Sequence, residues 1–153
     1  MSQPLKIALG ADHGGFELKQ QLLDHLGRMG HAVQDCGTNS TLAVDYPGIA
    51  HAVASLVATG ACDFGIMVDG AGIGSAMTAN KVPGVRAAAC YNDALARNSR
   101  EHNDANVLSL GAKMISPDAA REILALWLET PFAGGRHQRR IDKIRAIEEK
   151  HGK

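Results

Sequence analysis

The chain has 153 residues, of which 45% are hydrophobic and 4% aromatic, and its 16 lysines and arginines balance 16 aspartates and glutamates. This length predicts a single domain over residues 1–153 that buries roughly two thirds of its unfolded surface. The lack of net charge argues against general attraction to nucleic acid or to an anionic membrane, and no apolar run reaches the roughly 18 residues of a membrane span. The three cysteines form no CxxC pair, which is typical of a reducing compartment and indicates no metal site. We therefore expect a soluble cytoplasmic protein.

Short apolar runs alternate with longer segments of helical period, which is typical of βαβ units around a parallel sheet. Strands are predicted at 6–10, 31–35, 64–68, 85–90 and 107–110, with helices at about 18–29, 47–59, 74–81, 94–100, 117–129 and 137–151. The apolar faces of these helices are formed by Leu18, Leu22, Leu26, Met29, Ile49, Val53, Leu56, Val57, Ile123, Leu124 and Trp127. The pattern predicts an α/β fold, a Rossmann-like three-layer α/β/α sandwich. Its five-stranded parallel sheet has the order 2-1-3-4-5 and is followed by a C-terminal helix.

The third strand runs into a glycine-rich loop, Asp69-Gly70-Ala71-Gly72-Ile73-Gly74. Glycines let backbone N–H groups approach an anion or a developing oxyanion closely, because no Cβ stands in the way. Asp69 has two interpretations at this stage. It either caps the following helix or carries chemistry.

Strands one and three are neighbours in the predicted order, so the topological switch point lies between their carboxyl ends. Strand one leads into Asp12-His13-Gly14-Gly15, and strand three leads into the Asp69 loop. We expect the two glycine turns, both carboxylates and His13 to meet in one crevice. Taken singly, Asp12 fits a helix cap and His13 a surface histidine, but their convergence with Asp69 favours a functional site.

Two further polar segments stand out. Residues 99–106 form a short, almost wholly polar connection, which is either a solvated loop or part of a site. In residues 134–140, Arg136 and Arg140 are four apart and share a helix face, an arrangement that suits bidentate binding of a phosphate. A solvated basic helix or a nucleic-acid patch are the alternatives, and the missing aromatics and net charge argue against the latter.

Together these segments carry a family resemblance. Asp12-His13-Gly14-Gly15, Asp45-Tyr46-Pro47, the glycine loop with residues 79–88, residues 99–107 and residues 134–142 occur in order over nearly the whole chain. In this respect the sequence resembles the type B ribose-5-phosphate isomerases and the related galactose-6-phosphate isomerase subunits.

The resemblance implies an aldose–ketose isomerase of a phosphorylated sugar, such as ribose 5-phosphate or a related tetrose or hexose phosphate, that needs no metal or organic cofactor. It also implies a homodimer or a dimer of dimers whose sites are shared between chains. His102 would assist ring opening, and the glycine-loop amides would stabilise the enediolate. The substrate-binding residues implied in this way are Asp12, His13, Tyr46, Gly70, Ala71, Gly72, Gly74, Asn103, Lys113, Arg136 and Arg140.

The chain departs from the family pattern at the base. Many members have cysteine where this chain has Asp69 and a hydroxyl residue where it has Ala71, and another branch has glutamate where it has Ser75. Asp69 is the only ionisable side chain inside the loop, and carboxylates can move a proton next to a carbonyl. We therefore predict that Asp69 and His102 are catalytic. The alternative is a weak or inactive member that binds a sugar phosphate as a sensor or partner protein.

Overall fold

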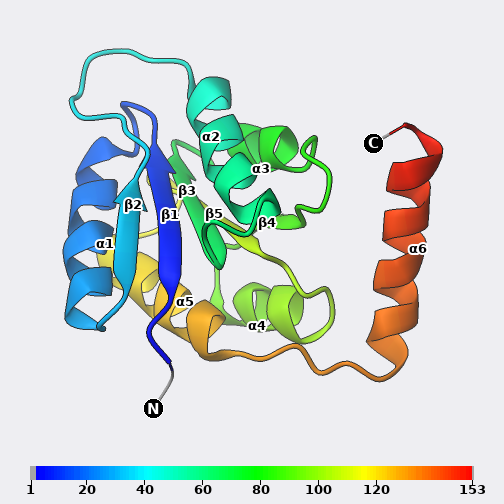
Figure 1. Cartoon of the computed structure of the whole chain (residues 1–153). Coiled ribbons are helices and arrows are strands. Elements are labelled where there is room, and N and C mark those ends of the chain that lie inside the picture. The colour runs from blue at the N-terminus through cyan, green and yellow to red at the C-terminus, as the bar shows by residue number, and fades with distance from the viewer. Residues whose placement is uncertain (1–2, 153) are drawn as a thin grey trace.

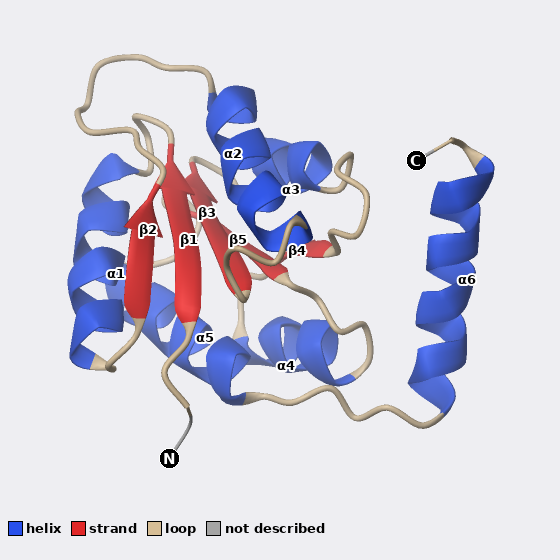
Figure 2. Cartoon of the chain, viewed as in Figure 1, coloured by secondary structure: helices blue, strands red, loops and turns tan. Residues whose placement is uncertain are grey.

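The computed structural model describes residues 3–152 and has the predicted architecture of a parallel sheet between helices (Figures 1 and 2). The strands are β1 (Lys6–Ala11), β2 (Ala32–Asp35), β3 (Phe64–Asp69), β4 (Ala87–Ala89) and β5 (Val107–Gly111). The helices are α1 (Phe16–Arg28), α2 (Tyr46–Ala58), α3 (Ile73–Ala79), α4 (Asp93–Glu101), α5 (Pro117–Glu129) and α6 (Arg136–Lys150). Each predicted element is present, with its ends shifted by at most two residues.

The strand order is β2-β1-β3-β5-β4, so the last two strands are exchanged relative to the predicted order. Burial explains the exchange. All five residues of β5 are buried, as an internal strand requires, whereas β4 has only three residues, each partly exposed, as expected of an edge strand. The pairs β1–β2, β1–β3, β3–β5 and β4–β5 are all parallel, so every strand has its carboxyl end at the same edge of the sheet.

The two faces of the sheet are covered by different helices (Figure 2). On one face, α1, α4 and α5 pack their apolar residues around the fully buried Trp127. On the other face, α2 and α3 cover the sheet with smaller residues such as Ala50 and Val53. The predicted core is confirmed, except that Met29, Ile49 and Leu56 are only partly buried.

Helix α6 stands apart from both layers (Figure 1). A groove of about 720 Å³ separates its inner face from β4 and α4. Among the described residues, the only direct hydrogen bond across the groove runs from the Gly84 amide to the Glu148 carboxylate, 2.9 Å away. Ile144 and Ile147 of this helix therefore remain exposed, Ile147 by 61%.

Candidate functional site

The first cluster lies at the carboxyl ends of β1 and β3. The Asp12 amide donates to the Val68 carbonyl (3.2 Å), and a Cβ added to Gly14 would lie 3.8 Å from the Gly70 nitrogen. The turns after the two strands are therefore side by side, as the switch-point argument predicts. The Asp12 side chain is only 8% exposed, and its Oδ1 accepts a hydrogen bond from the Gly15 amide (3.1 Å).

Asp69 is held by its own loop. Its Oδ1 accepts from the amides of Ala71 (3.1 Å) and Gly72, and its Oδ2 accepts from the amide (3.1 Å) and the hydroxyl (2.6 Å) of Ser75. A carboxylate has about four acceptor positions, so all of them are filled, and the side chain is 4% exposed. Among these donors only the Ser75 amide belongs to the first turn of α3, whose N-cap is Gly72, so Asp69 caps the helix in part and mainly fixes the loop before it.

The same contacts change the expected role of two loop amides. Ala71 and Gly72 donate to Asp69 in this structure, so their N–H groups do not face a sugar. The amides of Gly70 and Gly74 have no acceptor among the hydrogen bonds of the described residues. The part of the loop that offers free donors is therefore smaller than the sequence suggested.

The carbonyls of the loop are also held. The Tyr91 hydroxyl donates to the Ala71 carbonyl (2.5 Å), and the Ser109 hydroxyl donates to the Gly72 carbonyl (2.7 Å). Burial and, second to it, the negative charge of Asp69 raise the pKa of Tyr91, so its phenol remains a donor. Sequence patterns did not predict either contact, because Tyr91 follows β4 and Ser109 lies in β5, both far from the loop in the sequence.

Four more predicted residues surround this crevice. The Tyr46 ring lies over Gly74, where a Cβ would come within 2.3 Å of the phenol oxygen, so only glycine fits. The His13 ring nitrogen Nδ1 is 3.1 Å from both the carbonyl oxygen and the amide nitrogen of Val44, which fixes the loop before α2. Lys113 is exposed, and its side chain passes close to Gly70. The structure thus brings all four to the rim around Asp12 and Asp69.

The second cluster joins the end of α4 to the start of α6. The rings of His102 and His137 are stacked, with centroids 4.2 Å apart and planes at 14°. Burial, followed by the charges of His102, Arg136 and Arg140, lowers the pKa of His137. Arg136 and Arg140 are exposed and make no ion pair or side-chain hydrogen bond within residues 3–152. This cluster therefore presents two free guanidinium groups beside an exposed histidine.

Two arginines that the sequence analysis did not single out shape the loop after His102. Arg86 donates to the carbonyls of Asn103 (3.1 Å) and Asp104 (2.8 Å), while Arg100 donates to the carbonyl of Ala105 (2.6 Å). Both guanidinium groups also contact the Asp104 carboxylate, at 3.4 and 3.1 Å. Asp104 has a φ of 47°, a left-handed conformation that this double contact helps to hold. In the sequence, only the i,i+4 spacing of Arg100 and Asp104 indicated any of these contacts.

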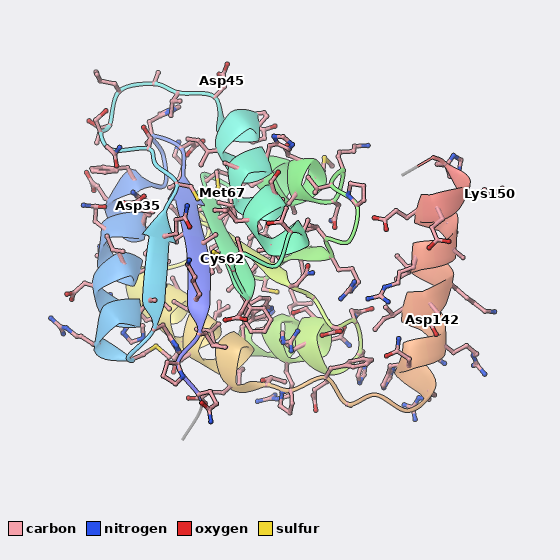
Figure 3. All side chains as sticks on the ribbon, viewed as in Figure 1. Asp35, Asp45, Cys62, Met67, Asp142 and Lys150 are labelled. Atoms are coloured by element: carbon pink, nitrogen blue, oxygen red, sulfur yellow. The ribbon has the colours of Figure 1, made fainter. Side chains whose placement is uncertain are left out.

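The two clusters lie at opposite edges of the sheet. Asp12, Asp69 and Lys113 follow the carboxyl ends of their strands, whereas His102 and Asn103 precede the amino end of β5. The five residues of β5 alone span about 15 Å. In Figure 3, Asp45 lies just before the start of α2, and Asp142 lies on α6, well away from it across the view. One chain therefore cannot bring all the predicted site residues together.

Between residues 3 and 152, no group of three or more His, Cys, Asp or Glu side chains is arranged to hold a metal ion. None of the helices in that range has the length and apolar character needed to cross a membrane. All three cysteines are unpaired, and burial raises the pKa of each thiol.

The fold is that of a Rossmann-like α/β protein with a crevice at the carboxyl ends of its parallel strands, where ligands bind in such sheets. The ribose/galactose isomerase family model matches residues 7–144. Ribose-5-phosphate isomerase B of Escherichia coli is 44% identical over 145 residues, covering 95% of this chain and 97% of that protein. The chain therefore belongs to the ribose/galactose isomerase family of sugar-phosphate isomerases.

Solved structures agree with this assignment. The Clostridium thermocellum ribose-5-phosphate isomerase B superposes with a TM-score of 0.95 at 48% identity, covering 96% of this chain and 99% of that one. The Mycoplasma genitalium ribose-5-phosphate isomerase B with bound ribulose 5-phosphate gives a TM-score of 0.91 at 39% identity, with 94% and 96% covered.

Proposed function

We propose that this chain interconverts ribose 5-phosphate and ribulose 5-phosphate in the cytoplasm. The observation that carries the proposal is the pair of half-sites, a glycine-loop crevice with two carboxylates and a cluster with two uncommitted arginines beside a histidine. The first suits proton transfer next to a carbonyl, and the second suits a phosphate and a sugar ring. Three unpaired cysteines support a reducing compartment.

The active unit is a homodimer in which each crevice faces the arginine cluster of the other copy. Because the half-sites of one chain lie at opposite edges of its sheet, a two-fold axis that joins one crevice to the partner's cluster joins the second pair as well. The groove beneath α6 supports this arrangement, since it is lined by the exposed apolar residues Leu95, Ile144 and Ile147. A second copy of the chain covers this surface, and the same contact completes both sites.

Each residue then has a role set by its place. Arg136 and Arg140 bind the phosphate, and His102 and Asn103 act on the sugar ring. Asp12, His13, Tyr46 and Lys113 hold the open chain, and the free amides of Gly70 and Gly74 face the enediolate oxygen. A base takes the proton from C2 of the aldose, and the electron pair of that C–H bond forms the enediolate, with the negative charge on O1. A proton then passes from the C2 hydroxyl to O1 through solvent, and the base or solvent returns a proton to C1, which leaves a carbonyl at C2.

Asp69 is the proposed base, and Ser75 controls its availability. Three of the four donors to Asp69 are backbone amides fixed by the loop, but the Ser75 hydroxyl can rotate and free Oδ2 for the substrate proton. Asp12 is the rival, because its second oxygen makes no hydrogen bond among the described residues. None of the three thiols is a substitute base, since burial raises the pKa of each and keeps it protonated.

A panel of tetrose, pentose and hexose phosphates followed by NMR in deuterated water tests the activity. We expect deuterium from solvent at C2 of the aldose and C1 of the ketose, fastest with the pentose phosphates. Thermal stabilisation by a sugar phosphate without any deuterium incorporation would instead identify a sensor or partner protein.

Matched variants of the two carboxylates identify the base. Asp69→Asn should slow deuterium exchange by roughly 10²- to 10⁴-fold, the usual contribution of a general base, whereas Asp12→Asn should cost less. Asp69→Cys distinguishes a role of Asp69 as the base from a role as a helix cap. A thiolate at this position can move the proton, but a sulfur atom cannot accept the four hydrogen bonds that the carboxylate accepts. If Asp69→Cys and Asp69→Asn are equally inactive and equally destabilised, Asp69 is only a cap. If Asp12→Asn abolishes exchange and Asp69→Asn does not, Asp12 is the base.

A further inference from the structure

Asn98, one turn before His102 on α4, contacts both of the polar residues at the end of that helix. Its Nδ2 lies 3.0 Å from Nδ1 of His102, and its Oδ1 lies 3.1 Å from Nδ2 of Asn103. Nothing in the sequence analysis singled out this residue.

The direction of each hydrogen bond follows from one backbone carbonyl. Nδ2 of Asn103 lies 3.4 Å from the carbonyl oxygen of Asn98, which can only accept, so this end of Asn103 is its NH₂ group. The same NH₂ group faces the side chain of Asn98, which must present its oxygen there. The remaining end of the Asn98 amide is its own NH₂ group, and it faces Nδ1 of His102. Nδ1 must therefore accept, and it carries no proton.

We infer that Asn98 is a positioning residue that fixes His102 as the neutral imidazole with its proton on Nε2. The inference rests on the proposed function, in which His102 faces the sugar ring. Reversing the Asn98 amide would set its NH₂ group against that of Asn103, so the alternative tautomer costs a hydrogen bond. Stacking on His137, whose lowered pKa keeps it uncharged, holds the plane of the His102 ring.

The tautomer decides what His102 does. Its Nε2 makes no hydrogen bond with the described residues, and the side chain is exposed, so the N–H group is free to meet a partner's substrate. When the furanose opens, the bond between C1 and the ring oxygen breaks and a C1 carbonyl forms. The proton of the anomeric hydroxyl passes through solvent to the ring oxygen, and the Nε2–H group stabilises the negative charge that develops there. His102 thus acts as a hydrogen-bond donor.

The tautomer can be measured directly on the full-length protein. With ¹⁵N-labelled histidine, long-range proton–nitrogen spectra distinguish a protonated ring nitrogen from a bare one, and His102→Gln assigns the signals among the seven histidines. We expect Nε2 protonated and Nδ1 bare in the wild type. Asn98→Asp should move the proton to Nδ1, because a carboxylate there can only accept, and Asn98→Leu should remove the preference. Arg97→Gln, an exposed change on the same helix, is the control for α4.

Kinetics then separate ring opening from proton transfer. Ribulose 5-phosphate is acyclic, because its C5 oxygen carries the phosphate, so exchange of its C1 hydrogen in deuterated water needs no ring opening. Asn98→Asp should lower turnover of ribose 5-phosphate about 10- to 100-fold while C1 exchange stays near the wild-type rate. A wrong histidine tautomer costs roughly 10⁴-fold in serine proteases, where that histidine moves the proton itself.

Several outcomes would overturn the inference. A protonated Nδ1 in the wild type does so whatever the activity, as does an unchanged tautomer in Asn98→Asp. Equal losses of turnover and exchange in Asn98→Asp would indicate a merely structural residue. The proposed function fails separately, if the wild type has the Nε2–H tautomer but exchanges deuterium into no sugar phosphate.

Discussion

The two half-sites of this chain differ in how far their polar groups are already engaged. Around Asp69, the carboxylate, two loop amides and two loop carbonyls all have partners within the chain. Around His102, by contrast, the backbone is held by Arg86 and Arg100, but the side chains of Arg136 and Arg140 and Nε2 of His102 are free. Folding therefore satisfies most polar groups of the first half-site, apart from the Gly70 and Gly74 amides and one oxygen of Asp12, whereas the side chains of the second half-site remain free for a ligand.

This difference assigns separate tasks to the two halves. Fixed dipoles stabilise developing charge without reorganising, so the glycine loop suits the enediolate. Long, exposed arginines cost conformational entropy when they bind, which the phosphate must offset. The parallel sheet keeps the two half-sites apart within one chain. The main test is therefore whether one active site needs residues from two chains.

The largest effect is expected from mixing two inactive variants. Asp69→Asn disables the crevice, and the double variant Arg136→Met with Arg140→Met disables the phosphate cluster. A heterodimer of the two, isolated with different affinity tags, contains one site with both halves intact and one with neither, so it should regain about half of the wild-type turnover. The measurement is turnover of ribose 5-phosphate by the purified heterodimer and by each parent homodimer.

A heterodimer as inactive as its parents would contradict the shared site. A well-populated monomer with full activity, found by sedimentation at assay concentrations, would contradict it independently.

A smaller effect is expected from each arginine alone. Hydrogen bonds to charged groups contribute about 1.5–3 kcal/mol, so Arg136→Met or Arg140→Met should raise KM for the sugar phosphate roughly 10- to 100-fold with less change in kcat. Arg145→Met is the matched control, because nine residues after Arg136 place it on the opposite face of α6. A change confined to kcat, or an equal effect of the control, would show that the phosphate does not bind at this cluster.

Sequence patterns predicted the fold well because burial in parallel sheets leaves simple signals. The continuous apolar strands and the i,i+4 leucines of α1 gave the elements and most of the core. The exchange of β4 and β5 was missed because the assumed order came from the commonest topology. Lys19 was missed for another reason. It is fully buried on the apolar side of α1, where its ammonium meets the Asp35 carboxylate at 2.6 Å, a pair that no local pattern indicates.

The candidate site was predictable as a set of motifs but not as a geometry. Switch-point reasoning brought Asp12 beside the glycine loop, because adjacent strands are enough for that conclusion. The four hydrogen bonds to Asp69, and the link from Asn98 to His102, depend on side-chain directions that spacing does not specify. The separation of the two clusters follows from topology, and could have been inferred from the position of His102 before the fifth strand.

The smallest expected effect concerns the pH dependence of stability, which His25, a residue outside both half-sites, should influence. Burial, followed by the charges of Arg121 and Arg28, lowers the pKa of His25, and its Nε2 is buried without a partner. The unfolded chain titrates this histidine near pH 6.5, so above that pH both states are neutral and stability is unaffected. As the pH falls below 6.5 the unfolded state takes up the proton first, so the free energy of unfolding decreases.

His25→Leu should therefore reduce the loss of stability between pH 7.5 and pH 5.5, as measured by urea unfolding, and His51→Gln controls for the loss of an exposed imidazole. His137 also has a lowered pKa, so part of the pH dependence should persist in His25→Leu. Besides burial, the charges of Arg136 and Arg140 contribute to the lowered pKa of His137, so a bound phosphate that neutralises them should raise that pKa. The remaining pH dependence should therefore diminish when a sugar phosphate binds there. If the ligand leaves it unchanged, the arginine cluster does not bind the phosphate, whatever the kinetics of the single variants.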